Sequence, residues 1–137
     1  RQDAVEIGRE AIPELERLQL TDRSLAAMPI AREAERYAPE EVSRIRKNWT
    51  QFNLPTEPEG AQVEIKNYVD VDGPWVALGT SPIQNVLVPF GFYRVRISKA
   101  GYVPVELSTN SAGRESIILL AEFLKTCLTA TKPCGVF

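Results

Sequence analysis

The residue types that most often carry out enzyme chemistry are scarce in this chain. Its 137 residues include no histidine, which excludes Ser-His-Asp and Cys-His catalysis and imidazole ligands for a metal. The two cysteines, Cys127 and Cys134, are too few for a structural zinc site, and they lack the C-x-x-C spacing of a redox pair. We favour two free thiols, with a small disulfide loop as the alternative if the chain is exported.

Acidic residues offer two further candidates. The run Asp70-Val71-Asp72-Gly73 suggests a calcium loop, but EF-hand spacing puts Gly79 where a bidentate glutamate must stand. An acidic turn is therefore expected, with a looser calcium site as the alternative. Glu57 and Glu59 flank a proline. Paired carboxylates catalyse only in a shaped cleft, so we expect these two to lie in an exposed turn without a catalytic role.

The chain also lacks the motifs of protein kinases, with no H-R-D, no D-F-G and no Gly-rich loop. We therefore predict a non-catalytic chain that uses no cofactor and no metal. A net charge of −2, from 16 basic and 18 acidic residues, predicts no concentrated basic surface for nucleic acid. No run of about twenty apolar residues is present, so we expect no membrane-spanning segment. Because the chain opens at Arg1, we expect an excerpt of a longer protein or a processed product.

The remaining chemistry is that of binding. Aromatic side chains anchor protein interfaces or stack on sugars, and several here exceed what a core pattern needs. Phe92 alternates away from Tyr93, so it is expected to face outward, while Trp75 lies in a long acidic loop. Packing of these aromatics in the core or at its rim is the simpler interpretation. The candidate interaction surface consists of Tyr68, Asp70, Asp72, Trp75 and Phe92.

The elements that must position these residues are mostly strands. Two stretches alternate between apolar and polar residues with the period of two that is typical of a strand with one buried face. The apolar positions are Ala61, Val63 and Ile65 in the first stretch, and Tyr93, Val95 and Ile97 in the second. Shorter apolar runs at 75–78, 86–88 and 103–107 are separated by Gly and Pro. This pattern predicts an antiparallel β-sandwich or a small barrel.

Residues 58–102 resemble the PEGA domain family in five marks that stand in the family's order. The marks are Pro58-Glu59-Gly60-Ala61 with the strand after it, Leu78-Gly79-Thr80-Ser81-Pro82 as the "LG-x-TP" turn, the strand Val86 to Val88, Gly91-Phe92-Tyr93-Arg94-Val95-Arg96, and Lys99-Ala100-Gly101-Tyr102. The resemblance implies a compact Ig-like sandwich of the kind found in surface-layer proteins and membrane-anchored bacterial proteins.

The chain departs from the common PEGA pattern between Ile65 and Leu78, where it has the segment from Lys66 to Trp75. The family usually has a short "D-G-x" hairpin there, and this chain has a longer loop. The longer form is similar to PEGA modules that lie outside the catalytic domain of bacterial Ser/Thr protein kinases. This resemblance makes the loop the expected place for family-specific recognition.

The first fifty residues are expected to be helical. A stripe at spacings of three and four, formed by Ala4, Ile7, Ala11, Leu15 and Leu18, predicts one amphipathic helix. Pro13 inside it predicts a kink or a break near Ile12, and Thr21 or Asp22 is expected to cap the next helix. Pro39 predicts the start of a third helix, and Trp49 is expected to cover the base of the sandwich before the strands begin near Thr50.

A stripe of small residues marks the second helix. The spacing Ala27-x3-Ala31-x2-Ala34-x4-Pro39 resembles the second helix of a tetratricopeptide repeat, which implies a helical hairpin used for protein contacts. The first helix lacks the Trp, Gly and Tyr positions of that repeat, and Pro29 interrupts the second. A helical hairpin without an independent binding role is therefore favoured over a true repeat.

The sequence thus predicts an α+β chain in three parts. A helical hairpin with a third helix occupies residues 1–50, a PEGA-type antiparallel sandwich occupies 51–108, and a linker with an apolar tail, strand or short helix, occupies 109–137. The expected function is that of a non-catalytic interaction or sensing module in the extracytoplasmic part of a larger, membrane-anchored bacterial protein such as a Ser/Thr kinase. Its partner would be an unidentified protein or cell-wall ligand. A carbohydrate or cell-wall binding module and a structural spacer are the alternatives.

Overall fold

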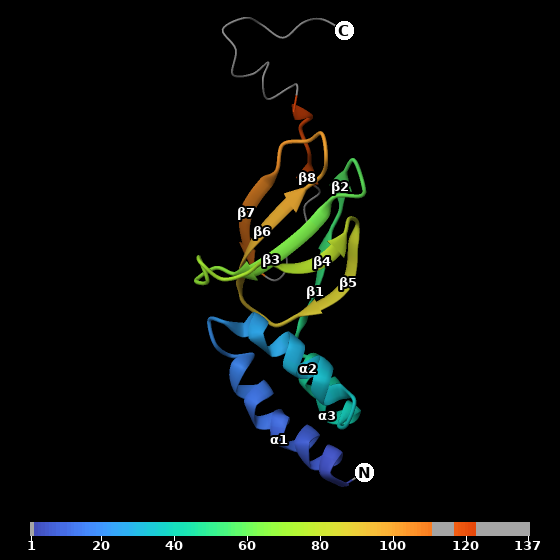
Figure 1. Cartoon of the computed structure of the whole chain (residues 1–137), viewed down its shortest axis with the longest axis vertical. Helices are drawn as coiled ribbons and strands as arrows, with labels where there is room; N and C mark the ends of the chain where they lie inside the picture. The colour runs from blue at the N-terminus through green and yellow to red at the C-terminus, as the bar shows by residue number, and fades with distance from the viewer. Residues whose placement is uncertain (1, 111–116, 123–137) are drawn as a thin grey trace, which may run out of the picture.

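The computed structural model describes residues 2–110 and 117–122, with side chains from residue 10 onward. Its helical end comprises α1 (Gln2–Leu18), the 3₁₀ turn η1 (Ser24–Ala26), α2 (Ala27–Glu35) and α3 (Pro39–Arg46). The strands are β1 (Thr50–Leu54), β2 (Thr56–Glu57), β3 (Gln62–Asn67), β4 (Val76–Thr80), β5 (Ile83–Val88), β6 (Phe92–Ser98), β7 (Val105–Asn110) and β8 (Ile117–Ile118). The helices form one end of an elongated molecule and the strands the other (Figure 1). The predicted α+β class is confirmed.

The strands form a four-stranded antiparallel sheet and two small pairs. The sheet has the order β4-β3-β6-β7, and the pairs are β1 with β5, antiparallel, and β2 with β8, parallel. One core cluster contains residues of both layers, such as Val63 and Val95 of the sheet and Phe52 and Val88 of the β1–β5 pair. The arrangement is that of a small sandwich, as the alternating pattern predicted.

The six apolar positions of that pattern are all fully buried. Among them, Tyr93 near the start of β6 donates a hydrogen bond from its hydroxyl to the carbonyl of Pro89, four residues upstream. A tyrosine that bonds back to the backbone at the corner between two strands is typical of Ig-like sandwiches. Burial raises the pKa of Tyr93 to about 12, although a contact with the Ser24 hydroxyl opposes the shift.

The prediction of a break in the first helix is wrong. Helix α1 runs from Gln2 to Leu18 with Pro13 inside it. The proline lacks the N–H donor of one helical hydrogen bond. Because its ring is exposed, the loss of this bond affects the helix only locally. The stripe positions Ala4 and Ile7 lie outside the described side chains.

The capping prediction is also wrong, because no side chain caps η1 or α2. Thr21 instead closes the end of α1. Its hydroxyl donates to the carbonyl of Leu18 (2.8 Å) and accepts the backbone N–H of Arg23 (3.2 Å). A threonine can make such local bonds in place of capping the following helix.

The alanine stripe is buried between helices, as its spacing predicted. Ala27 and Ala31 have no exposed surface, and the cluster around them contains Leu15 of α1 and Val42 of α3. Pro39 begins α3 as expected, and Pro29 lies in the first turn of α2. The three helices therefore pack as one unit around small side chains.

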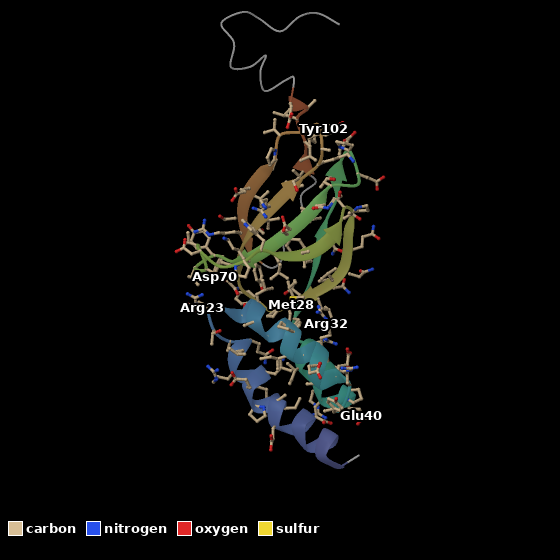
Figure 2. The ribbon with its side chains drawn as sticks, viewed as in Figure 1. Arg23, Met28, Arg32, Glu40, Asp70 and Tyr102 are labelled. Atoms are coloured by element: carbon tan, nitrogen blue, oxygen red, sulfur yellow. The ribbon has the colours of Figure 1, made fainter. Side chains whose placement is uncertain are left out.

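Two kinds of contact join the helices to the sandwich. Met28 of α2 packs against both the helical cluster and the sandwich core, and Figure 2 shows it on the side of the helices that meets the strands. Leu87 of β5 packs against the helical cluster that contains Trp49. The indole N–H of Trp49 donates to the side chain of Gln19 (2.7 Å). Trp49, which was predicted to cover the base of the sandwich, thus belongs to the helical cluster.

A buried polar network reinforces this junction. The side-chain carbonyl of Asn67 accepts the backbone N–H of Leu25 (2.9 Å), and its amide donates to the hydroxyl of Ser24 (3.3 Å). That hydroxyl also lies 3.4 Å from the hydroxyl of Tyr93. Buried polar networks whose members are all satisfied hold elements in one relative position.

Some strand boundaries differ from the expected ones. Gly79 and Thr80, expected in a turn, belong to β4, and the turn falls at Ser81-Pro82. Strand β7 extends to Asn110, so the predicted linker from Thr109 begins inside a strand. The apolar tail begins as a strand with β8, and Leu119 after it is buried in the sandwich core. Cys127 and Cys134 lie outside the described residues.

Candidate functional site: a groove between helices and sandwich

A groove of about 770 Å³ opens where the helical end meets the sandwich. Its walls are Gln19 to Asp22 after α1, Tyr68 and Val69 after β3, Phe90 to Phe92 between β5 and β6, and Ser108 to Asn110 at the end of β7. We call it the junction groove. Its volume lies in the range of binding sites for small ligands and side chains.

The junction groove gathers most of the large apolar side chains that the described part of the chain exposes. Leu20 is 85% exposed, Phe90 68% and Phe92 65%, and Tyr68 and Val69 are nearly half exposed. Contiguous exposed apolar surface marks interaction sites, whereas single exposed residues are common. Of the residues that line the groove, Asp22 alone is charged.

Phe90 and Phe92 are positioned by the turn between β5 and β6, whose backbone lies close to the 3₁₀ turn η1. Gly91 lies between them, and a Cβ added to it would come within 2.8 Å of the Ser24 hydroxyl. Only glycine lets the β5–β6 turn lie this close to η1. Phe92 then starts β6 with its side chain on the face opposite Tyr93, in register with Asn110 of β7.

Tyr68 is held in place by three contacts. Its backbone N–H donates to the carbonyl of Phe92 (2.9 Å), and its carbonyl accepts a bond from Nε of Arg94 (2.7 Å). The Arg94 guanidinium also lies over its ring, 4.3 Å from the ring centre, a cation–π contact. This wall of the groove is therefore formed before any ligand arrives, which lowers the entropic cost of binding.

Leu20 reaches the groove because α1 ends just before it. The backbone N–H of Thr21 bonds to the carbonyl of Leu18 (3.1 Å), and the Thr21 hydroxyl closes the same turn. Leu20 lies two positions beyond Leu18, so it does not share the buried face of the helix. It is left almost fully exposed at the rim of the groove.

Of the residues expected in the interaction surface, Tyr68 and Phe92 lie together in the junction groove. Asp70 lies beside the groove, where its carboxylate bonds to Arg23 (3.0 Å), and Figure 2 shows the two side chains facing each other across the junction. Asp72 is exposed on the loop. Both ends of the Arg23–Asp70 pair are partly exposed, so it contributes little stability. Within residues 10–110 and 117–122, no acidic or cysteine cluster is suited to hold a metal.

Trp75 does not line the groove. Its ring lies under two cations, Lys66 at 4.5 Å and Arg96 at 4.6 Å from the ring centre. Lys66 is buried and donates to the carbonyls of Val71 (2.8 Å) and Gly73 (3.3 Å). At least one face of the indole is thus occupied. Trp75 and Lys66 together hold the long loop in shape, and sugar stacking on that face would have to displace a cation.

Leu20, Val69 and Phe90 also line the groove and were not selected from the sequence. The sequence contains a feature that could have identified two of these residues. Leu20 is an apolar residue outside the helical stripe, directly before the polar pair Thr21-Asp22. Phe90 stands in a turn next to Gly91, where an apolar side chain has no strand face to join. No comparable signal marks Val69, because its exposure depends on the course of the loop.

No protein-family model matches this chain, and no curated protein matches it. The resemblance to PEGA modules therefore rests on the residues quoted above. In the stretches 2–110 and 117–122, no helix is both long and apolar enough to cross a membrane.

Proposed function

We propose that this chain is a non-catalytic interaction module of a larger protein and that it binds a partner protein through the junction groove. The observation that carries the proposal is the convergence of Leu20, Tyr68, Val69, Phe90 and Phe92 on one groove. These five residues come from three separate segments of the chain. Exposing so much apolar surface in one place lowers solubility, so it is expected only where a partner covers it.

The resemblance of residues 58–102 to PEGA modules supports a proposal for the kind of larger protein and for its cellular location. We propose a membrane-anchored bacterial protein such as a Ser/Thr kinase, with this chain in its extracytoplasmic part. The helical end would then stand between the sandwich and the rest of the protein. Because Asn67, Ser24 and Met28 fix the helices to the sandwich, a partner at the groove would hold both parts at once.

The test compares the proteins that the chain retains from detergent-solubilised membranes of its host, using chemical cross-linking and quantitative mass spectrometry. Three forms are immobilised: the wild type, Phe90→Ser with Phe92→Ser, and Ile118→Ser. Ile118 is 69% exposed on β8 and does not line the groove, so its variant controls for the loss of an exposed apolar side chain. We expect a protein that the wild type and Ile118→Ser retain and the groove variant does not.

Two other results would overturn the proposal. Retention of cell-wall polysaccharide that is lost on Trp75→Ala, with the groove variant unaffected, would establish a carbohydrate-binding module. Equal retention of the same proteins by all three forms would leave the groove without a role, in agreement with a structural spacer. Circular dichroism must first show the same fold in each form, which is expected because the substituted side chains are exposed.

A further inference from the structure

The junction groove is continuous with one edge of the four-stranded sheet, which is formed by β7. In the four-stranded sheet, β7 pairs with β6 along one side. No other strand of the described part pairs with its second side. Every second residue of such a strand directs its backbone N–H and C=O groups away from the sheet. Ser108 and Thr109, which belong to this strand, also line the groove.

The two ends of this edge differ in how well they can accept another strand. Pro104 stands just before β7, and Glu106 is exposed near its start. A proline and a charged side chain are devices that keep other strands from pairing with an edge. The end from Leu107 to Thr109 carries neither. Leu107 to Thr109 therefore lack the two features that block pairing, and Ser108 and Thr109 of this stretch line the groove.

The charge at the rim of the groove indicates which charged side chains the partner segment would carry. Asp22 is the one charged residue among those that line it, and it is exposed at the rim. The neighbouring carboxylate of Asp70 is already paired with Arg23. A partner segment with a lysine or arginine next to its apolar residues would pair with Asp22 at this rim.

We infer that the junction groove binds an extended segment of a partner protein, which adds as a strand along Leu107 to Thr109 of β7. The segment places an apolar side chain between Tyr68, Phe90 and Phe92 and a basic side chain near Asp22. Backbone hydrogen bonds supply part of the affinity in this mode of recognition, and the groove supplies selectivity for the side chains. The inference rests on the proposed function of the groove and specifies the shape of the partner.

The probe is a displayed library of random peptides, selected on the wild type and counter-selected on the Phe90→Ser, Phe92→Ser variant. The selected peptides are then synthesised with one backbone amide methylated at a time, and their affinities are measured by fluorescence anisotropy. For an added strand, methylation at every second position removes a bond to β7. We expect a loss of about tenfold at alternate positions and little change between them.

The side chains provide a second measurement. We expect the selected peptides to be enriched in lysine or arginine at one position. Asp22→Asn should then weaken binding about two- to fivefold at low salt and less at high salt, as for an exposed charge pair. Ile118→Ser should bind as the wild type does.

The outcomes separate this inference from the proposed function. Peptides that depend on Phe90 and Phe92 but show no alternation on methylation would overturn strand addition and leave the groove as a docking site. A selection that yields no groove-dependent peptide, together with no groove-dependent protein from membranes, would overturn both. Sedimentation showing a dimer of the wild type that the Phe90→Ser, Phe92→Ser variant abolishes would identify a second copy of this chain as the occupant and overturn the inference.

Discussion

Removing the hydroxyl of Tyr93 tests the junction on which the groove depends. In Tyr93→Phe the ring keeps its place in the core, where it has no exposed surface, while the bond to the Pro89 carbonyl and the contact with Ser24 are lost. The carbonyl of Pro89 then stays buried without this donor. A buried polar group left without its partner costs about 1–3 kcal/mol, so we expect the free energy of unfolding at neutral pH to fall by that amount.

The contribution of the Tyr93 hydroxyl to stability depends on pH. The pKa of Tyr93 rises from its ordinary value of 10.0 to about 12 on folding. The unfolded chain therefore releases this proton first, and the stability that the neutral hydroxyl contributes is present below pH 10 and is lost as the pH rises toward 12. At about 1.4 kcal/mol for each pKa unit, the wild type should lose about 2–3 kcal/mol more than Tyr93→Phe over this window.

The assay is urea unfolding followed by tryptophan fluorescence, for the wild type, Tyr93→Phe and Tyr68→Phe. Tyr68 is 47% exposed, so its variant controls for the loss of a phenol that is not buried. The difference between wild type and Tyr93→Phe should be constant up to about pH 9 and narrow above about pH 10. Effects of alkaline pH that are common to both proteins cancel in the difference. If the difference in the free energy of unfolding between wild type and Tyr93→Phe stays constant through the alkaline range, the conclusion that folding keeps this hydroxyl buried and protonated is refuted.

Three further predictions concern packing, and each is checked by thermal or urea unfolding. Leu119→Ala should destabilise the chain by about 2–4 kcal/mol because Leu119 is buried in the sandwich core, whereas Leu120→Ala, at a residue 44% exposed, should change little; equal effects would place the segment after β8 outside the core. Ala31→Leu should cost about 1–3 kcal/mol because Ala31 is fully buried among the helices, and the exposed Ala26 gives a control, Ala26→Leu, that should be nearly neutral. Trp75→Ala should destabilise by about 1–3 kcal/mol through loss of its two cation–π contacts yet leave groove-dependent binding within about twofold; a loss of binding with unchanged stability would return Trp75 to the interaction surface.

The elements of this fold were largely readable from the sequence because they obey local rules. Period-two alternation placed on the core six residues that lie in β6, in β3 or directly before β3, and all six are buried. The alanine spacing placed α2 against its neighbours, and Pro39 marked the start of α3. In each case the residue type and its spacing alone determine the outcome. The error at Pro13 has the same origin, since the local rule for proline was outweighed by the packing of the rest of the helix.

The candidate site was only partly readable because it is made of residues far apart in the chain. Tyr68 and Phe92 could be selected as surplus aromatics, but nothing local brings Leu20 next to them. That proximity depends on Asn67 receiving the backbone N–H of Leu25 and on the absence of a side chain at Gly91. Both are contacts across the junction, and neither has a sequence pattern of its own. Trp75 is the opposite case. Its position in the loop suggested binding, but the cations of Lys66 and Arg96 already lie against its ring.

The junction also explains why the groove can be apolar without collapsing. Exposed leucine and phenylalanine side chains would normally pack together, yet the backbone that carries each of these side chains is held by contacts of its own. Leu20 is held by the closed end of α1, and Phe90 and Phe92 by the turn pressed against Ser24. Gly91→Ala should therefore act on the groove as well as on stability, because a Cβ at this position would push the turn away from η1. A variant that remains folded but loses groove-dependent binding, with Tyr68 and Phe92 unaltered, would show that the spacing of the walls, and not their apolar character alone, determines what the groove accepts.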